Sequence, residues 1–252
     1  MFATIVSDQF TSDELELIAS SLSEICSPDD NYGWASNGLY SFWDTGTSEI
    51  LYLGLSKDLP RRFREHAGLK ECDVKGCKVS QIKDYFAANP GAALGYSVVL
   101  QSVMEQTGQS AFAIFHPEMG DTGTKDMKAG EGLLLQAHKL VRGDLPAWNK
   151  IGGDRDASDL AKHGHEPILR FLSEVDRDCP YRAELPLRSL AKNAVVVNEE
   201  LELHLIRMFA LNFTGDLKEA LEIHRGMQRS NPDSDKTLNR SNCKRWIERW
   251  CR

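Results

Sequence analysis

The sequence predicts an α+β protein with a small three-stranded, mostly antiparallel sheet flanked by helices, an N-terminal helix and a mainly helical C-terminal region. Two apolar, aromatic-rich runs, residues 39–43 and 50–55, flank the turn-forming sequence DTGTS, which is the pattern of a β-hairpin. A further alternating run over 94–103 predicts the third strand. Many of the remaining apolar residues recur at helical spacing, which predicts helices around this sheet.

The N-terminal residues, 1–36, are predicted to form an acidic helical segment. Thr11 begins a capping-box pattern, and the apolar residues that follow recur at helical spacing, so we expect a helix over 12–25 and a turn-rich linker over 27–36. Residues 1–37 contain seven Asp or Glu and no Lys or Arg. This acidic surface is either a solvated face or a mimic that occupies a DNA-binding groove.

The predicted hairpin carries two tyrosines. If its turn is centred on Gly46, Tyr40 and Tyr52 lie opposite each other as a cross-strand pair on one face of the sheet. A one-residue slip in register would put them on different faces. Cross-strand tyrosines are usually packing residues, so this pair alone indicates no function.

A short helix is predicted directly after the hairpin. Asp58 is a suitable N-cap, and Pro60 lies in the first turn, where its missing N–H costs no hydrogen bond. Arg62 and His66 are four residues apart and therefore project from one face of this helix. Such a pair commonly belongs to a solvated surface, but together with the two tyrosines it can form one polar site.

The later part of the chain is predicted to be mostly helical. Glu131 falls in the first turn of one helix, where the helix dipole stabilises a carboxylate even without a metal. Residues 112–115 predict a short strand or turn. The predicted helices cover 79–88, 129–142, 167–174, 199–213 and 216–229, and the stretch 116–128, which contains proline and glycine, is predicted to be a loop near the site.

Composition limits the function classes. The 252 residues are 41% hydrophobic and 27% charged, which is ordinary for a globular protein. No apolar run approaches membrane length and no signal pattern begins the chain, so we expect a cytoplasmic protein without a membrane partner. The six cysteines are unevenly spaced and predict neither a disulfide framework nor a zinc site.

Charge and aromatic residues bear on nucleic-acid binding. The net charge of −7 argues against a simple nucleic-acid binder, but the acidic excess lies entirely in residues 1–37. The last 28 residues carry eight basic and three acidic side chains. Trp246 and Trp250, next to Lys244 and Arg245, could stack on bases, although docking of an amphipathic helix on the core is the favoured interpretation.

Two spaced motifs resemble those of the GIY-YIG endonuclease family. Gly38-Leu39-Tyr40 is followed, after eleven residues, by Tyr52-Leu53-Gly54, with leucine where the family usually has isoleucine or valine. The helix that follows has the pattern Leu-x-x-Arg-x-x-x-His, ending at His66. The resemblance covers about residues 37–153. It implies three regions: the N-terminal segment, a GIY-YIG-like nuclease domain over 37–155 and a mainly helical C-terminal region over 156–252.

The family also has a metal-binding glutamate on a later helix, and an asparagine after it that often follows a proline. Glu131 and the Asn149 of the sequence PAWN match these two positions. The resemblance therefore implies a site of six residues, with Glu131 as the ligand of Mg²⁺ or Mn²⁺. The six are Tyr40, Tyr52, Arg62, His66, Glu131 and Asn149.

The resemblance implies a role for each residue in phosphodiester hydrolysis. Arg62 is expected to hold a phosphate oxygen, Tyr40 to activate the attacking water, and His66 to receive the proton. Tyr52 is expected to orient the water or the phosphate, and Asn149 to support the site by hydrogen bonding. Further nucleic-acid contacts are expected from Lys57, Arg61, Arg64, Lys244 and Arg245.

The expected function is therefore a metal-dependent DNA endonuclease, with restriction or defence-type cleavage of double-stranded DNA as the leading role. A homodimer on DNA is expected in that case, because one such site cuts one strand. A repair or structure-selective nickase and a single-strand-specific nuclease are alternatives of the same class. A nucleic-acid-binding or interaction module that has lost catalysis is the alternative of another class.

Overall fold

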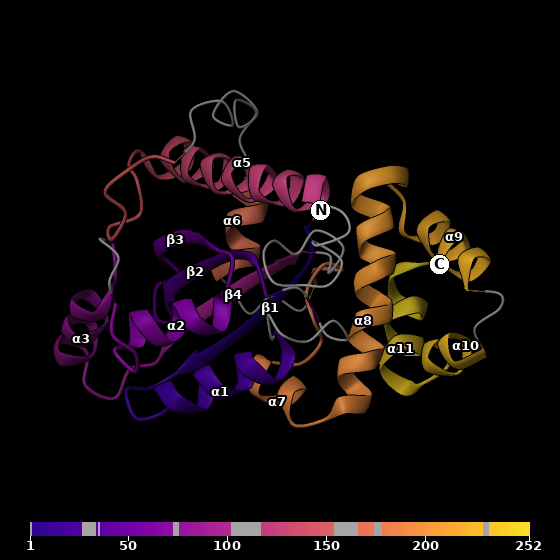
Figure 1. Cartoon of the computed structure of the whole chain (residues 1–252), viewed down its shortest axis with the longest axis horizontal. Coiled ribbons are helices and arrows are strands. Elements are labelled where there is room, and N and C mark those ends of the chain that lie inside the picture. The colour runs from indigo at the N-terminus through magenta and orange to yellow at the C-terminus, as the bar shows by residue number, and fades with distance from the viewer. Residues whose placement is uncertain are drawn as a thin grey trace.

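The computed structural model describes residues 2–26, 34, 36–72, 76–101, 117–153, 166–173, 178–228 and 232–252. It has the predicted α+β class, with helices on both faces of one sheet (Figure 1). The strands are β1 (Phe2–Phe10), β2 (Gly38–Asp44), β3 (Ile50–Ser56) and β4 (Leu94–Gln101). They pair in the order β1-β4-β2-β3, and every pair is antiparallel.

The helices of the first half are α1 (Leu15–Ile25), α2 (Leu59–Ala67), α3 (Val79–Ala88) and α5 (Pro117–Arg142). The second half contains α6 (Glu166–Ser173), α7 (Leu187–Ala191), α8 (Ala194–Phe209), the π-helical turn η3 (Ala210–Thr214), α9 (Leu217–Met227), α10 (Pro232–Leu238) and α11 (Ser241–Trp250). None of the helices in the described residues is long and apolar enough to cross a membrane.

The sheet has four strands where the sequence predicted three. The additional strand, β1, pairs with β4 along its whole length, from Phe2 to Phe10. Ile5 also forms two backbone hydrogen bonds with the segment that follows α6. Its N–H donates to the Tyr181 carbonyl (2.8 Å), and its carbonyl accepts from the N–H of Ala183 (2.9 Å). A short apolar run cannot show that its partner lies some ninety residues away, so the N-terminal segment was predicted as helical only.

The two faces of the sheet are buried by different helices. Alternation along β2 puts Tyr40 and Phe42 into the larger core cluster, which includes side chains of α1, α2, α3 and α7. Leu39 points the other way and packs with residues of α5 and α6, such as Leu134 and Leu169. The sheet therefore lies between α5 and α6 on one side and α1 and α2 on the other (Figure 1).

The C-terminal helices dock on the sheet through α8, which packs against β1, and α9 to α11 gather on the far side of α8 (Figure 1). Arg207 of α8 is fully buried and pairs with Glu200 at 2.9 Å. Its guanidinium also donates to the carbonyls of Pro180 (2.7 Å) and Arg182 (3.0 Å). These bonds satisfy a buried cation and join α8 to the segment that pairs with β1.

Trp246 supports the docking interpretation of the C-terminal tryptophan pair. It is fully buried in the cluster between α8 and α11, and its indole N–H donates to the Pro180 carbonyl at 3.1 Å. A buried indole cannot stack on a base. Trp250 is partly buried on the same cluster, with the Arg249 guanidinium over its ring.

Most predicted helices are present, but the predicted loop over 116–128 is wrong from residue 117 onward, because α5 begins at Pro117. A proline fits the first turn of a helix, and glycines within a helix cost only about 1 kcal/mol each, so this stretch does not have to break. Glu131 is therefore in the middle of α5 and not in its first turn. The predictions for residues 27–33 and 112–115 lie outside the described residues.

Candidate functional site

The register of the hairpin differs from the predicted one. Tyr40 pairs with Gly54, and Phe42 pairs with Tyr52, with an irregularity between Phe42 and Trp43. The shift from the expected pairing of Tyr40 with Tyr52 is two residues, an even number, so both tyrosines remain on one face. They are diagonal neighbours, and their ring centroids are 5.8 Å apart.

Steric contacts explain why both of these motif positions are occupied by glycine. A Cβ atom on Gly54 would lie 2.8 Å from Cζ and Oη of Tyr40 and 2.8 Å from Cε1 of Tyr52. The Tyr40 ring thus lies across β3 at the one residue without a side chain. A Cβ atom on Gly38 would lie 2.3 Å from the carbonyl oxygen of Val99 in β4. The motif glycines are therefore needed for close packing around the tyrosines.

Helix α2 carries the two other motif residues to the tyrosines. Asp58 caps the helix by accepting from the N–H of Arg61 at 2.9 Å, as the sequence predicted. The Tyr40 hydroxyl lies 2.7 Å from Nε2 of His66 and 3.4 Å from Nε of Arg62. The structure thus brings Tyr40, Tyr52, Arg62 and His66 together over one face of the hairpin.

The hydrogen bond at the second ring nitrogen of His66 indicates which nitrogen carries the proton. The backbone N–H of Lys78 donates to Nδ1 of His66 at 3.0 Å, so Nδ1 carries no proton. Burial, and then the charges of Arg62 and Lys78, lower the pKa of His66 to about 3. The neutral ring therefore carries its proton on Nε2 and donates it to the Tyr40 oxygen. This geometry makes His66 a donor to Tyr40 rather than the proton acceptor expected from the sequence.

The tyrosines differ in exposure. Tyr40 is only 1% exposed, and burial raises the pKa of its hydroxyl well above 10, with Arg62 opposing that shift. Tyr52 is half-buried, and burial also raises its pKa, while the hydroxyl of Tyr40 and the charge of Arg62 oppose the rise. Tyr52 is therefore the phenol that solvent reaches, and Tyr40 is the one behind it.

A buried carboxylate that sequence reasoning missed holds Arg62 in place. Glu65 accepts from Nη1 of Arg62 at 3.0 Å and from Nε of Arg61 at 2.9 Å. Burial raises the pKa of Glu65, but the hydrogen bonds and charges of the two arginines outweigh burial and lower it overall. The spacing of Glu65 from Arg62 and Arg61, three and four residues on a helix, is a signal that could have identified it.

Glu131 and Asn149 meet the hairpin at the outer edge of β3. The side-chain amide of Asn149 accepts from the N–H of Leu53 (2.9 Å) and donates to its carbonyl (2.8 Å), as a neighbouring strand would. The Glu131 carboxyl group lies near the backbone N–H of Leu55, which opposes the rise that burial causes in its pKa. Asn149 thus supports the backbone of this edge strand through two hydrogen bonds, and its expected part in the chemistry of the site stays a prediction.

The surroundings of Glu131 disfavour the charged form of its carboxyl group. Burial raises the pKa of its carboxyl group, and its charge in turn raises the pKa of Tyr52. Within the part of the chain that the structure describes, no three His, Cys, Asp or Glu side chains gather into a metal site. Among those residues, Glu131 therefore does not belong to a ready-made group of three metal ligands.

The predicted nucleic-acid contacts lie in several places. Lys57 is exposed just after β3, and Arg61 on α2 is half-exposed while pairing with Glu65. Arg64 lies against α1 and donates to the Ser23 hydroxyl at 2.8 Å, away from the tyrosines. Lys244 and Arg245 are on α11, on the side of the molecule away from α2 (Figure 1).

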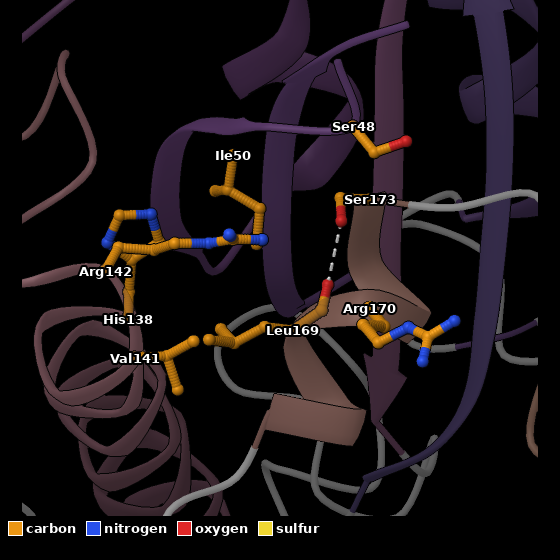
Figure 2. Close-up of a pocket in the computed structure, with 8 residues that line it drawn as sticks. All are labelled: Ser48, Ile50, His138, Val141, Arg142, Leu169, Arg170 and Ser173. Carbon is orange, nitrogen blue, oxygen red and sulfur yellow. Dashed lines mark hydrogen bonds between the residues drawn. The ribbon is translucent and has the colours of Figure 1, made fainter.

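A small pocket lies on the opposite face of the sheet and is separate from the tyrosine cluster. Figure 2 shows His138 and Arg142 of α5 on one side and Leu169, Arg170 and Ser173 of α6 on the other. Its free space is about that of one water molecule. The pocket has no room for an organic substrate.

Comparison with known proteins adds no relative: no family model, no curated protein and no solved structure matches this chain.

Proposed function

We propose that this chain is a GIY-YIG-type endonuclease that uses a divalent metal ion to hydrolyse phosphodiester bonds of DNA. The observation that carries the proposal is the convergence of the six motif residues from three distant stretches of sequence. Tyr40, Tyr52, Arg62 and His66 meet over the hairpin. Glu131 and Asn149 reach the edge of the same hairpin from the region of α5.

The donor set at Glu131 fits a hard divalent cation. Mg²⁺ is commonly held by one or two carboxylates and completes its shell with water and substrate phosphate, so a lone carboxylate is sufficient. A carboxyl group whose pKa is raised by burial also gains from a neighbouring cation. Mg²⁺ or Mn²⁺ bound there would supply a positive charge that stabilises the leaving 3′-oxygen.

The protein's own groups account for the remaining steps. Arg62, held by Glu65, binds a non-bridging oxygen of the scissile phosphate through its guanidinium fork. Tyr52 orients the attacking water, whose proton passes to solvent at the half-buried side of Tyr52 as the bond to phosphorus forms and the bond to the 3′-oxygen breaks. The N–H groups of His66 and Arg62 point at Tyr40 Oη and hold the neutral phenol in place, so that its own hydroxyl is directed at Tyr52.

Double-stranded DNA is the proposed substrate and restriction or defence the proposed role, with a homodimer placing one site on each strand. The second candidate is a nucleic-acid-binding module without catalysis. One observation favours it: Tyr40 is almost fully buried and its hydroxyl already has protein partners. The exposed edge at Tyr52 and Glu131 favours the enzyme, because both are half-buried and accessible.

The deciding experiment compares the wild type with Glu131→Gln on supercoiled plasmid in the presence and absence of Mg²⁺. Glutamine keeps an oxygen for the N–H of Leu55 but removes the charge, so it separates metal binding from support of the strand edge. The matched control is Lys139→Gln, an exposed position on the same helix. Mg²⁺-dependent cleavage by wild type and control but not by Glu131→Gln supports the enzyme; equal inactivity of all three supports the binding module.

The products then separate the kinds of nuclease. Discrete linear fragments indicate site-specific cleavage of both strands, and relaxed circles indicate a nickase. Cleavage confined to a single-stranded oligonucleotide indicates a single-strand-specific enzyme. A methyltransferase gene beside the coding gene would support the restriction role.

A further inference from the structure

Lys78 is a buried lysine at the centre of the candidate site. It immediately precedes α3, its backbone N–H is bonded to His66, and the residue is only 4% exposed. Its Nζ lies 4.6 Å from the centroid of the Tyr52 ring. Lysine is rarely buried to this degree without a charged partner, so the position needs an explanation.

The ammonium of Lys78 lacks an acidic partner among the described residues. The two other buried cations, Arg182 and Arg207, donate to carbonyl oxygens, and Arg207 also pairs with Glu200. Around Lys78 the neighbouring cations are instead Arg62 and Lys150, and each of them repels the ammonium of Lys78. Burial first, and then these two charges, lower the pKa of Lys78.

The ammonium is not fully enclosed. Among the described residues, the fully enclosed side-chain polar atoms without a partner lie elsewhere, and Nζ of Lys78 is not one of them. Helix α3 begins directly after Lys78 and no side chain caps its N-terminus, so the helix dipole adds positive charge at this end of the ten-residue helix. The ammonium lies over the ring of Tyr52, and this cation–π contact does not use up the N–H donors from which an anion would accept.

We propose that Lys78, with Lys150 at the rim, forms an anion-binding subsite beside Tyr52 that takes a phosphodiester group of a nucleic-acid strand. A phosphate group suits the site because an ammonium binds it as a point charge and helix N-termini bind it through backbone N–H groups. A bound anion also offsets the repulsion that Arg62 and Lys150 exert on Lys78. The inference that the anion belongs to a nucleic acid rests on the proposed function. The inference that it is a phosphate rests on the observations at the site alone.

The first test measures binding of a fluorescent duplex oligonucleotide in the Glu131→Gln background, so that cleavage does not interfere. Lys78→Met keeps the apolar stem and removes the charge, and Lys83→Met on the exposed side of α3 is its matched control. We expect about tenfold weaker binding for Lys78→Met and a plot of log affinity against log salt that is shallower by about one unit. Lys78→Arg should keep most of the affinity, and Lys83→Met all of it.

The second test uses inorganic phosphate as the probe and the rise in Tm as the readout. Phosphate should stabilise the wild type and Lys83→Met but not Lys78→Met. Should Lys78→Met fail to fold, Lys150→Met changes an exposed residue and should weaken both the oligonucleotide and the phosphate effect about twofold to threefold.

The two tests separate the subsite from the nuclease assignment. Phosphate stabilisation that depends on Lys78, together with no oligonucleotide binding by wild type, supports the subsite and refutes the nucleic-acid assignment. Oligonucleotide binding with the same affinity and salt dependence in Lys78→Met overturns the subsite and leaves the nuclease proposal intact. Absence of both effects in the wild type refutes both.

Discussion

The hydrogen bond from Lys78 to His66 predicts an unusual pH dependence of stability. His66 is fully buried and neutral, with a pKa of about 3 in the folded state against about 6.5 in an unfolded chain. Below pH 6.5 the unfolded chain binds a proton that the folded protein does not. Stability from this residue is therefore complete above pH 6.5 and is lost progressively as the pH falls toward 3.

The size of the effect does not depend on the folded-state pKa, provided that it lies below 5. Between pH 7.5 and 5.0, protonation of the unfolded histidine lowers the free energy of unfolding by about 2 kcal/mol. The fully buried His204, whose pKa is also lowered to about 3 by burial and by Arg207, contributes a similar amount. The wild type should thus lose about 4 kcal/mol from these two histidines, and His66→Gln about 2 kcal/mol.

The assay is urea denaturation of wild type and His66→Gln at several pH values between 5.0 and 7.5. Glutamine does not titrate and can still donate a hydrogen bond to Tyr40. The measured quantity is the slope of the unfolding free energy against pH, so a constant loss from the substitution cancels. Parallel profiles for the two proteins would show that His66 takes up a proton in the folded state as readily as in the unfolded chain, and would refute the neutral ring that accepts from Lys78.

The same tautomer predicts the kinetic behaviour of the proposed enzyme. If His66 only donates to Tyr40, His66→Gln should lose less than about tenfold in cleavage rate, whereas loss of a general base costs about 10²–10⁴-fold. The wild-type pH–rate profile should then show no acidic limb near pH 6.5. A limb at that pH that disappears in His66→Gln would restore the role of proton acceptor.

Three further predictions test the packing around the site and the attachment of the C-terminal region. Tyr40→Phe should leave the buried Nε2–H of His66 without an acceptor, which lowers stability by about 1–3 kcal/mol in urea denaturation, and should abolish plasmid cleavage. Gly54→Ala places a methyl group 2.8 Å from Tyr40 and should cost about 1–3 kcal/mol in the same assay, with loss of cleavage. Glu200→Gln leaves Arg207 as an unpaired buried cation and should cost about 3–5 kcal/mol without changing the chemistry of the site.

The glycine and ion-pair variants each have a matched control. Gly152→Ala adds a methyl group where no other atom lies within 4 Å, so it should change stability by less than about 0.5 kcal/mol. Glu222→Gln breaks an exposed ion pair with Arg225 and should cost at most about 1 kcal/mol. Controls as damaging as the test variants would show that the effects come from general fragility and not from the contacts described.

Local sequence signals predicted a large part of the fold. Helix α3 has the bounds predicted for it, Val79–Ala88, and the hairpin and the start of α2 are where turn and capping residues placed them. These elements were predictable because their determinants, such as the Asp58 cap, lie within a few residues of each other. The extent of α5 was not predictable from local signals, because in the sequence a glycine that a helix tolerates looks the same as a glycine in a loop.

In the candidate site, too, some features follow from local sequence and others depend on tertiary contacts. The sequence by itself determined that two tyrosines, an arginine, a histidine, a glutamate and an asparagine follow in a spaced order, and which of them share a face of α2. The tertiary structure alone decided the pairing of Tyr40 with Gly54, the partner strand of β1 and the presence of Lys78 beside Tyr52. It also decided the proton position on His66, because the N–H that settles it comes from another element. Spacing can specify a face, but register, burial and protonation depend on contacts between residues that are distant in sequence.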